Sequence, residues 1–273
     1  MRRREALQLL GSAALASTWA CARTRTEQLG AIGVQLYTVR DQMAKDVAAT
    51  LARVAEIGYL EVEFAGYFDQ TPEQIRALLD ANGLTAPSAH LGYEQLRDQW
   101  DETVDAARVV GHRYLTVPAI PDDMRTADGF KAAADQFNRF GEQAKAAGLA
   151  FAYHNHSYEF ADQGGKPGYD ILLDATDPAL VDFEMDIYWT VDGGADPLAY
   201  FARYPGRFTM VHVKGRTADG TMTEVGSGTI DWAAIFRHHE QAGIQHYFVE
   251  HDQPSDSFAS IQKSYEYLHA LQF

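Results

Sequence analysis

The chain has 273 residues, 46% hydrophobic and 22% charged, a composition typical of a globular protein that can bury one sizeable core. Its 38 acidic residues outnumber its 23 basic ones, which gives a formal net charge of −15. Such a surface repels nucleic-acid phosphates and anionic membranes, so we expect neither as a partner.

The first 28 residues have the features of a targeting segment. Arg2–Arg4 precede an apolar stretch, Leu7–Trp19, and Ala20–Ala22 offers a small-residue cleavage site. The stretch is shorter than the roughly 20 apolar residues that span a bilayer, so we expect no stable membrane insertion. Because Arg3–Leu7 resembles a twin-arginine export signal, we predict that residues 1–28 direct the protein to the periplasm or another extracytoplasmic location. A basic amphipathic first helix is the alternative.

Cys21 is the only cysteine, so the chain cannot form an internal disulfide. Lipid anchoring through Cys21 is a second alternative, although Thr18 stands where a lipoprotein signal usually has leucine.

From residue 31 onward, short apolar and β-branched runs alternate with segments of helical periodicity. The runs begin 26 to 38 residues apart, the length of one strand–helix unit. The expected strands are Ile32–Thr38, Tyr59–Phe64, Thr85–Leu91, Tyr114–Pro118, Ala150–His154, Val181–Asp186, Thr209–Val213 and Tyr247–Glu250. The expected helices include 47–55, 72–82, 129–147 and 230–241, each followed by a glycine that suits a helix C-terminus.

Eight strand–helix units without a linker predict a single-domain α/β fold, a closed (β/α)₈ barrel over residues 29–273. A doubly wound open sheet is the alternative. It would carry a glycine-rich phosphate loop after its first strand, and Gln35–Arg40 contains no glycine.

Ionisable side chains are concentrated at the C-terminal ends of the expected strands, where such barrels place their active sites. The segments that carry them are Glu61–Glu63, Ser88–His90, Tyr153–Phe160, Glu184–Trp189, His212–Lys214 and Glu250–Asp252. Burying several carboxylates together is costly unless a cation compensates. Carboxylates mixed with imidazoles suit one divalent ion of Mn, Co, Zn, Mg or Fe, so we predict such a cofactor.

Four motifs carry a resemblance to a known family. They are Tyr-His-Asn-His-x-x-Glu-Phe at 153–160, Asp-x-x-Trp at 186–189, His-Val-Lys at 212–214 and Val-Glu at 249–250. Over 31–273 the chain resembles the sugar phosphate isomerase/epimerase family, the xylose isomerase-like barrels that include inosose dehydratases and endonuclease IV. The resemblance implies a divalent ion held by four residues, three of which fall on Asp186, His212 and Glu250.

The fourth ligand departs from the family pattern. The resemblance implies a glutamate on the fifth strand, where this chain has His154. We predict that Glu159 turns back to serve as the ligand, with His154 as the alternative ligand or as an acid/base group.

Further roles follow from the chemistry that such a metal site supports. Glu250, Glu159 and His154 are the candidate catalytic bases. Lys214 is expected to hold an oxyanion or a substrate carboxylate, because a Schiff base would duplicate the role of the metal. Expected substrate contacts are Gln35, Tyr37, Glu63, His90 and Trp189. We expect Glu184 to form a structural ion pair.

The predicted activity is isomerisation or epimerisation of a small-molecule sugar through an enediolate. Export favours a non-phosphorylated sugar or keto-sugar. A 3-keto-glycoside lyase or dehydratase would use the same metal site and is the first alternative. A non-catalytic periplasmic sugar-binding barrel is another, and an endonuclease IV-like phosphodiesterase is disfavoured by the acidic charge. The oligomeric state is not predicted.

Overall fold

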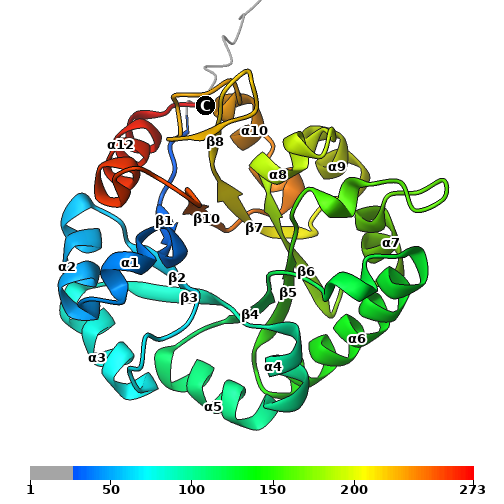
Figure 1. Cartoon of the computed structure of the whole chain (residues 1–273), viewed down its shortest axis with the longest axis horizontal. Helices are drawn as coiled ribbons and strands as arrows, with labels where there is room; N and C mark the ends of the chain where they lie inside the picture. The colour runs from blue at the N-terminus through cyan, green and yellow to red at the C-terminus, as the bar shows by residue number, and fades with distance from the viewer. Residues whose placement is uncertain (1–26) are drawn as a thin grey trace, which may run out of the picture.

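The computed structural model describes residues 27–273, so all but the last two residues of the predicted export signal, together with Cys21, lie outside the described part of the chain. Eight parallel strands close into a barrel in the order β1-β10-β7-β6-β5-β4-β3-β2, surrounded by a ring of helices (Figure 1). The barrel strands are β1 Gly33–Gln35, β2 Glu61–Phe64, β3 Thr85–His90, β4 Tyr114–Val117, β5 Ala150–His154, β6 Val181–Asp186, β7 Phe208–Val213 and β10 His246–Val249. The predicted closed barrel is confirmed.

The helices pack around the outside of this barrel (Figure 1). They are α1 Arg40–Met43, α2 Val47–Ile57, α3 Pro72–Asn82, α4 Tyr93–Asp98, α5 Trp100–Val110, α6 Ala127–Ala146, α7 Gly168–Ala175, α8 Ile187–Asp192, α9 Pro197–Arg203, α10 Trp232–Phe236, α11 His239–Ala242 and α12 Ser257–Ala270. Short 3₁₀ turns cover Leu36–Val39, Asp122–Met124 and Tyr158–Phe160, and β8 Gly215–Arg216 pairs with β9 Met222–Thr223.

Helix α3 has the bounds that the sequence predicts. Thr71 and Gln74 form a reciprocal capping box at its N-terminus, and Gly83 ends it with φ 64°. Two other elements differ from expectation. The first strand stops at Gln35, because the Gln35 side chain accepts a hydrogen bond from the Tyr37 amide and starts a 3₁₀ turn. The helix expected over 230–241 is divided into α10 and α11 at His238.

Alternation along the strands separates the barrel interior from the layer that faces the helices. On β6, Glu184 and Asp186 contact polar groups of other strands, whereas Phe183 packs against the ring of Tyr169 from α7. Deeper in the interior, Tyr114, Ala152, Met210 and Phe248 form a small apolar cluster. This cluster fills the barrel interior, so the polar side chains gather at the carboxyl ends of the strands.

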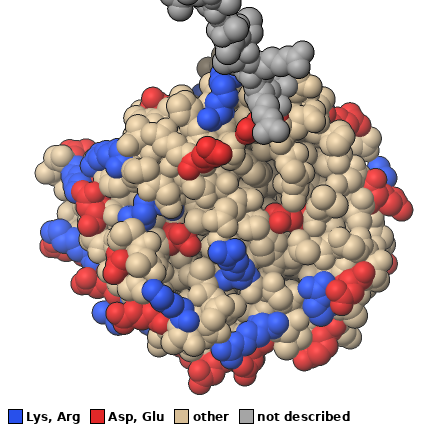
Figure 2. Space-filling view, turned by 180° about the vertical axis from the view of Figure 1, so that it is seen from behind, with Lys and Arg blue, Asp and Glu red and all other residues tan. Residues whose placement is uncertain are grey.

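The surface of the described chain is mixed in charge. Figure 2 shows Lys and Arg interspersed with Asp and Glu around one face of the barrel. Among residues 27–273, no helix is both long enough and apolar enough to cross a membrane. The backbones of Glu27 and Phe273 exchange two hydrogen bonds, so both ends of the described chain lie together.

Candidate metal centre

Four buried side chains converge at the carboxyl ends of neighbouring strands. His154 ends β5, Asp186 ends β6, His212 lies on β7, and Glu250 follows β10. Each offers one nitrogen or oxygen atom, and these atoms all lie within 4.8 Å of one another. The set comprises two imidazoles and two carboxylates, a donor set that suits a divalent transition metal.

Two atoms of this cluster lack hydrogen-bond partners although they are buried. His154 Nε2 and Asp186 Oδ2 lie 3.4 Å apart and neither accepts or donates a hydrogen bond. Burial, with His212 and His90 nearby, holds the pKa of His154 well below its usual value, so the ring is neutral, the form that binds metals. Buried polar atoms are normally paired, and a bound cation would supply the missing partner for both. The residues therefore fit the predicted ion.

Hydrogen bonds to one carboxylate oxygen and to the backbone of Asp186 hold this residue in place. Oδ1 accepts the Trp189 amide at 2.9 Å and caps α8, which leaves Oδ2 directed at the cluster. Asn155 accepts a hydrogen bond from the Asp186 amide at 3.1 Å and donates one to its carbonyl at 3.3 Å. The asparagine between the two histidines of the 153–160 motif thus joins the ends of β5 and β6.

Glu159 does not reach the cluster, contrary to its expected roles as ligand and base. Its Oε1 accepts the Tyr153 hydroxyl at 2.7 Å, and its Oε2 accepts the His156 amide at 3.0 Å. The 3₁₀ turn Tyr158–Phe160 directs the carboxylate towards its own loop and away from the barrel interior. Burial raises the pKa of Glu159 to about 7, against the opposing effect of the Tyr153 and His156 hydrogen bonds. Its observed contacts are structural, and His154, the alternative ligand, is the residue that lies with Asp186, His212 and Glu250.

Gln35 and Glu63 also differ from their expected role, because both are fully buried below the cluster and do not line the cavity. Glu63 Oε2 lies 2.7 Å from His212 Nε2 and 2.8 Å from Gln35 Nε2. Its Oε1 accepts the Ser88 hydroxyl, which also contacts Thr116. Glu63 therefore supports the metal-facing histidine. The sequence analysis missed Thr116, although short polar residues at inward strand positions are the signal for such a network.

His90 and Glu184 form a second, overlapping group with His154 and His212. His90 Nε2 lies 2.8 Å from Glu184 Oε2, and His212 Nε2 lies 3.3 Å from the same oxygen. Burial raises the pKa of Glu184, but His212 and His90 more than offset this and hold it well below its usual value. Glu184 was expected to form a structural ion pair, and its partners in the structure are His90 and His212. We assign the ion to the first group, because it contains Asp186, His212 and Glu250, the three ligands that the family resemblance implies.

Lys214 lies beside the cluster and contacts three carboxylates. Its Nζ is 2.6 Å from Glu250 Oε2, 2.9 Å from Asp252 Oδ1 and 2.9 Å from Asp186 Oδ2, the last an ion pair without directed hydrogen-bond geometry. Burial lowers the pKa of Lys214, but the three carboxylates reverse this and raise it well above its usual value. The side chain is therefore a fixed cation, unsuited to forming a Schiff base, which needs a neutral amine.

A cavity of about 480 Å³ opens above these residues. Its lining includes Tyr37, His90, His154, His156, Lys214, Glu250, Asp252 and Gln253. Trp189, an expected substrate contact, is not among the lining residues. The Trp189 ring instead packs near two residues that line the cavity. Its centroid lies 5.7 Å from that of the His156 ring and 5.6 Å from Lys214 Nζ. Tyr37 and His90 reach the cavity as expected.

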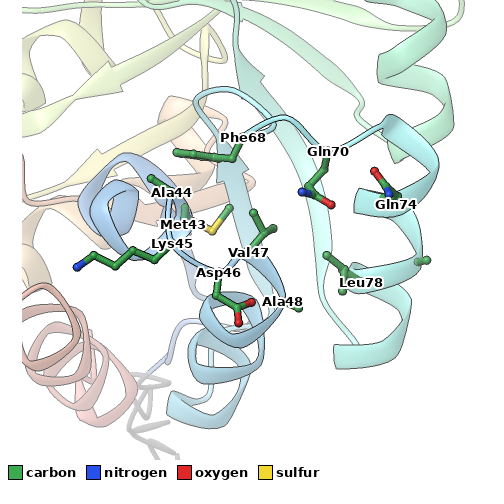
Figure 3. Close-up of a pocket in the computed structure, with 11 residues that line it drawn as sticks. Met43, Ala44, Lys45, Asp46, Val47, Ala48, Phe68, Gln70, Gln74 and Leu78 are labelled. Atoms are coloured by element: carbon green, nitrogen blue, oxygen red, sulfur yellow. The ribbon is translucent and has the colours of Figure 1, made fainter.

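A second cavity of similar size, about 490 Å³, lies outside the barrel between α2 and α3 (Figure 3). Met43, Val47 and Leu78 give it apolar walls. Lys45 points away from it in Figure 3, and Asp46 Oδ1 caps α2 through the Ala49 amide. Neither metal-ligand group of the described residues lies here, so the barrel mouth is the candidate site.

Comparison with known proteins agrees with this geometry. The family model for the xylose isomerase-like TIM barrel matches residues 51–272. The chain belongs to this family. The resemblance drawn from the four sequence motifs is therefore confirmed.

An inosose dehydratase from Geobacillus kaustophilus is 25% identical over 68% of this chain and 73% of its own length. The crystal structure of a sugar phosphate isomerase/epimerase from Parabacteroides distasonis superposes with a TM-score of 0.79 and 31% identity, over 88% of this xylose isomerase-like chain and 98% of that one. The IOLI protein, whose crystal structure holds a zinc atom, shares the fold (TM-score 0.69, 13% identity, 87% and 96% coverage). The dehydratase and the isomerase/epimerase are enzymes, in agreement with the expectation that this chain is one.

Proposed function

We propose that this protein is a divalent-metal-dependent enzyme that removes a proton next to the carbonyl of a neutral sugar or keto-sugar, of the isomerase or epimerase type. The observation that carries the proposal is a pair of buried atoms without hydrogen-bond partners, His154 Nε2 and Asp186 Oδ2, in a cluster completed by His212 and Glu250. These four residues would hold the ion. When bound, it would act as a Lewis acid that polarises the substrate carbonyl.

The residues around the cluster are suited to the proton transfer. Glu250 lines the cavity, and Lys214 and His212 hold its pKa well below its usual value, against the effect of burial, so it is an ionised carboxylate able to accept the proton. Lys214 is a fixed cation at the cavity wall, where it would stabilise negative charge developing on the substrate oxygen.

A substrate without phosphate fits the lining best. Among the described residues that line the cavity, Lys214 is the one lysine or arginine, and its charge is already shared by Asp186, Glu250 and Asp252. A phosphate group would meet these carboxylates without a further lysine or arginine to bind it. This agrees with the proposed export of the protein by its N-terminal segment.

Elimination is the second candidate outcome. Loss of a substituent from the carbon beyond the one deprotonated starts from the same enediolate and would make the enzyme a dehydratase or 3-keto-glycoside lyase. The similarity to inosose dehydratases favours this candidate, since their name describes such a loss of water.

Proton exchange tests the shared step. The Mn²⁺-loaded protein is incubated with keto-sugars in D₂O, and deuterium incorporation next to the carbonyl is followed by NMR. We expect exchange in the wild type and a loss of about a hundredfold or more in Glu250→Gln, the size typical of a general base. Exchange that is equally fast in Glu250→Gln would refute Glu250 as the base. No exchange and no turnover with any keto-sugar would refute the proposed function.

A further inference from the structure

We infer that the mouth of the cavity contains a second subsite, in which Tyr37 stacks against a neutral ring attached to the reacting sugar. The attached group would be a glycosidically linked sugar or an aryl aglycone. The inference rests on the proposed function and extends it, because it assigns the substrate to the glycosides.

Tyr37 is unusual in its exposure. It is 43% exposed, one of three large hydrophobic residues in residues 27–273 that the structure leaves exposed, and it lines the cavity that holds the metal cluster. Leu60, which is 53% exposed, lies just before β2, at the opposite end of the barrel from this cavity. An exposed aromatic ring at the mouth of a polar cavity is a surface on which a ring-shaped ligand can stack.

The Tyr37 ring is held in place before any ligand binds. The Arg40 guanidinium lies 4.1 Å from the ring centroid and donates a hydrogen bond to the Tyr37 carbonyl at 2.7 Å. The Tyr37 amide donates to the buried side chain of Gln35. With one face covered by Arg40, the other face and the ring edge remain for contact. A ring fixed in this way loses little conformational entropy when a ligand stacks on it.

The position of Tyr37 places the subsite on one side of the mouth. It follows β1, and Asp252 and Gln253 follow β10, the neighbour of β1 in the barrel. All three residues line the cavity. The proposed ligand His154 and the wall residue His156 come from β5 and the loop after it, on another side of the barrel. A second ring attached to a sugar at the cluster would extend along this side of the mouth, towards Tyr37.

The surroundings of Tyr37 favour a neutral group. Asp252 contributes negative charge on this side, and Lys214 is already paired with it. Arg40 is engaged with the Tyr37 ring and carbonyl. Asp252 and Gln253 offer hydrogen-bond acceptors and donors to hydroxyl groups. The volume of about 480 Å³ lies within the range of about 300–1,000 Å³ that protein ligand sites occupy.

Two probes that share one sugar test the subsite. Binding of methyl β-D-glucopyranoside and phenyl β-D-glucopyranoside to the Mn²⁺-loaded protein is measured by isothermal titration calorimetry. In the wild type we expect the phenyl glucoside to bind about tenfold more tightly, the size of one aromatic stacking contact. Tyr37→Ala should remove this preference and leave the methyl glucoside unaffected, whereas Tyr37→Phe should retain it. Leu60→Ala, which truncates an exposed apolar residue outside the cavity, is the matched control.

Equal affinities for the two glucosides in the wild type, or a preference that survives in Tyr37→Ala, would overturn the subsite. Loss of both glucosides in a folded Tyr37→Ala variant would assign Tyr37 to the reacting sugar and would also overturn it. Deuterium exchange tests the proposed function separately. Exchange without a Tyr37-dependent preference refutes the subsite alone, and a preference without exchange refutes the proposed chemistry alone.

Discussion

At the scale of single residues, Glu63 shows how a buried carboxylate can support a metal site without lining its cavity. It accepts from His212 Nε2, which leaves Nδ1 on the side of Asp186 and Glu250. We expect Glu63→Gln to weaken Mn²⁺ binding about ten- to a hundredfold, as for other partners of metal-binding histidines. Calorimetric titration with Mn²⁺ measures this. Glu61→Gln is the control, because Glu61 pairs with His246 at the other end of the barrel. Equal weakening in both variants would contradict a specific role for Glu63.

We expect Glu159 to make the stability of the protein depend on pH. Burial raises its pKa to about 7 from an ordinary value of 4.5, so the folded protein binds this proton more tightly than the unfolded chain. Its contribution to stability is therefore complete below pH 4.5 and is lost as the pH rises through 7. Relative to Glu159→Gln, the free energy of unfolding of the wild type should fall by on the order of 3 kcal/mol between pH 4.5 and 8.

Urea denaturation of both proteins across this pH range gives the measurement. Glu142→Gln, at an exposed position on α6, should track the wild type at every pH. A difference between the wild type and Glu159→Gln that stays constant with pH would show that Glu159 titrates normally.

At the scale of elements, the closure of the barrel depends on the close approach of β1 and β10. A Cβ atom on Gly33 would lie 2.5 Å from a ring carbon of Phe248. We expect Gly33→Ala to destabilise the protein by about 1–3 kcal/mol through overpacking, with partial recovery when Phe248→Leu is added. Gly30→Ala is the control, since a Cβ there meets no atom within 4 Å. Chemical denaturation measures the free energy of unfolding of each variant. A Gly33→Ala variant as stable as Gly30→Ala would show that the two strands can move apart without strain.

The elements were predictable from the sequence because their signals are local. Capping residues and glycine stops fix helices such as α3, and apolar runs fix the strands. Asp186, His212 and Glu250 were predicted as a set from the family resemblance, and they lie together because parallel strands end at the same edge of the barrel. The roles of Glu63 and Glu159 were not predictable in this way. For Glu63, the alternation along β2 indicates that the side chain points into the barrel, but it does not indicate how far below the cavity the side chain lies. For Glu159, the number of residues that separate it from β5 does not reveal the direction in which the loop turns.

At the scale of the whole molecule, the proposed export determines where the enzyme meets its substrate. The double change Arg3→Lys and Arg4→Lys should leave the full-length protein in the cytoplasm, because paired arginines are the feature that the segment shares with twin-arginine signals. Cell fractionation and immunoblotting of the expressed chain test this. Unchanged export of the double variant would point to another route, and retention of the wild type in the cytoplasm would contradict export itself.

The metal content of the purified protein tests the central claim most directly. The measurement is elemental analysis of the wild type after incubation with Mn²⁺ and removal of free ion, beside folded His154→Ala and Asp186→Ala variants. We predict one equivalent of divalent metal in the wild type and its loss in both variants, because these two residues carry the buried atoms of the cluster that lack hydrogen-bond partners. A wild type without metal would contradict the assignment of the cluster as a metal centre, and so would variants that retain a full equivalent.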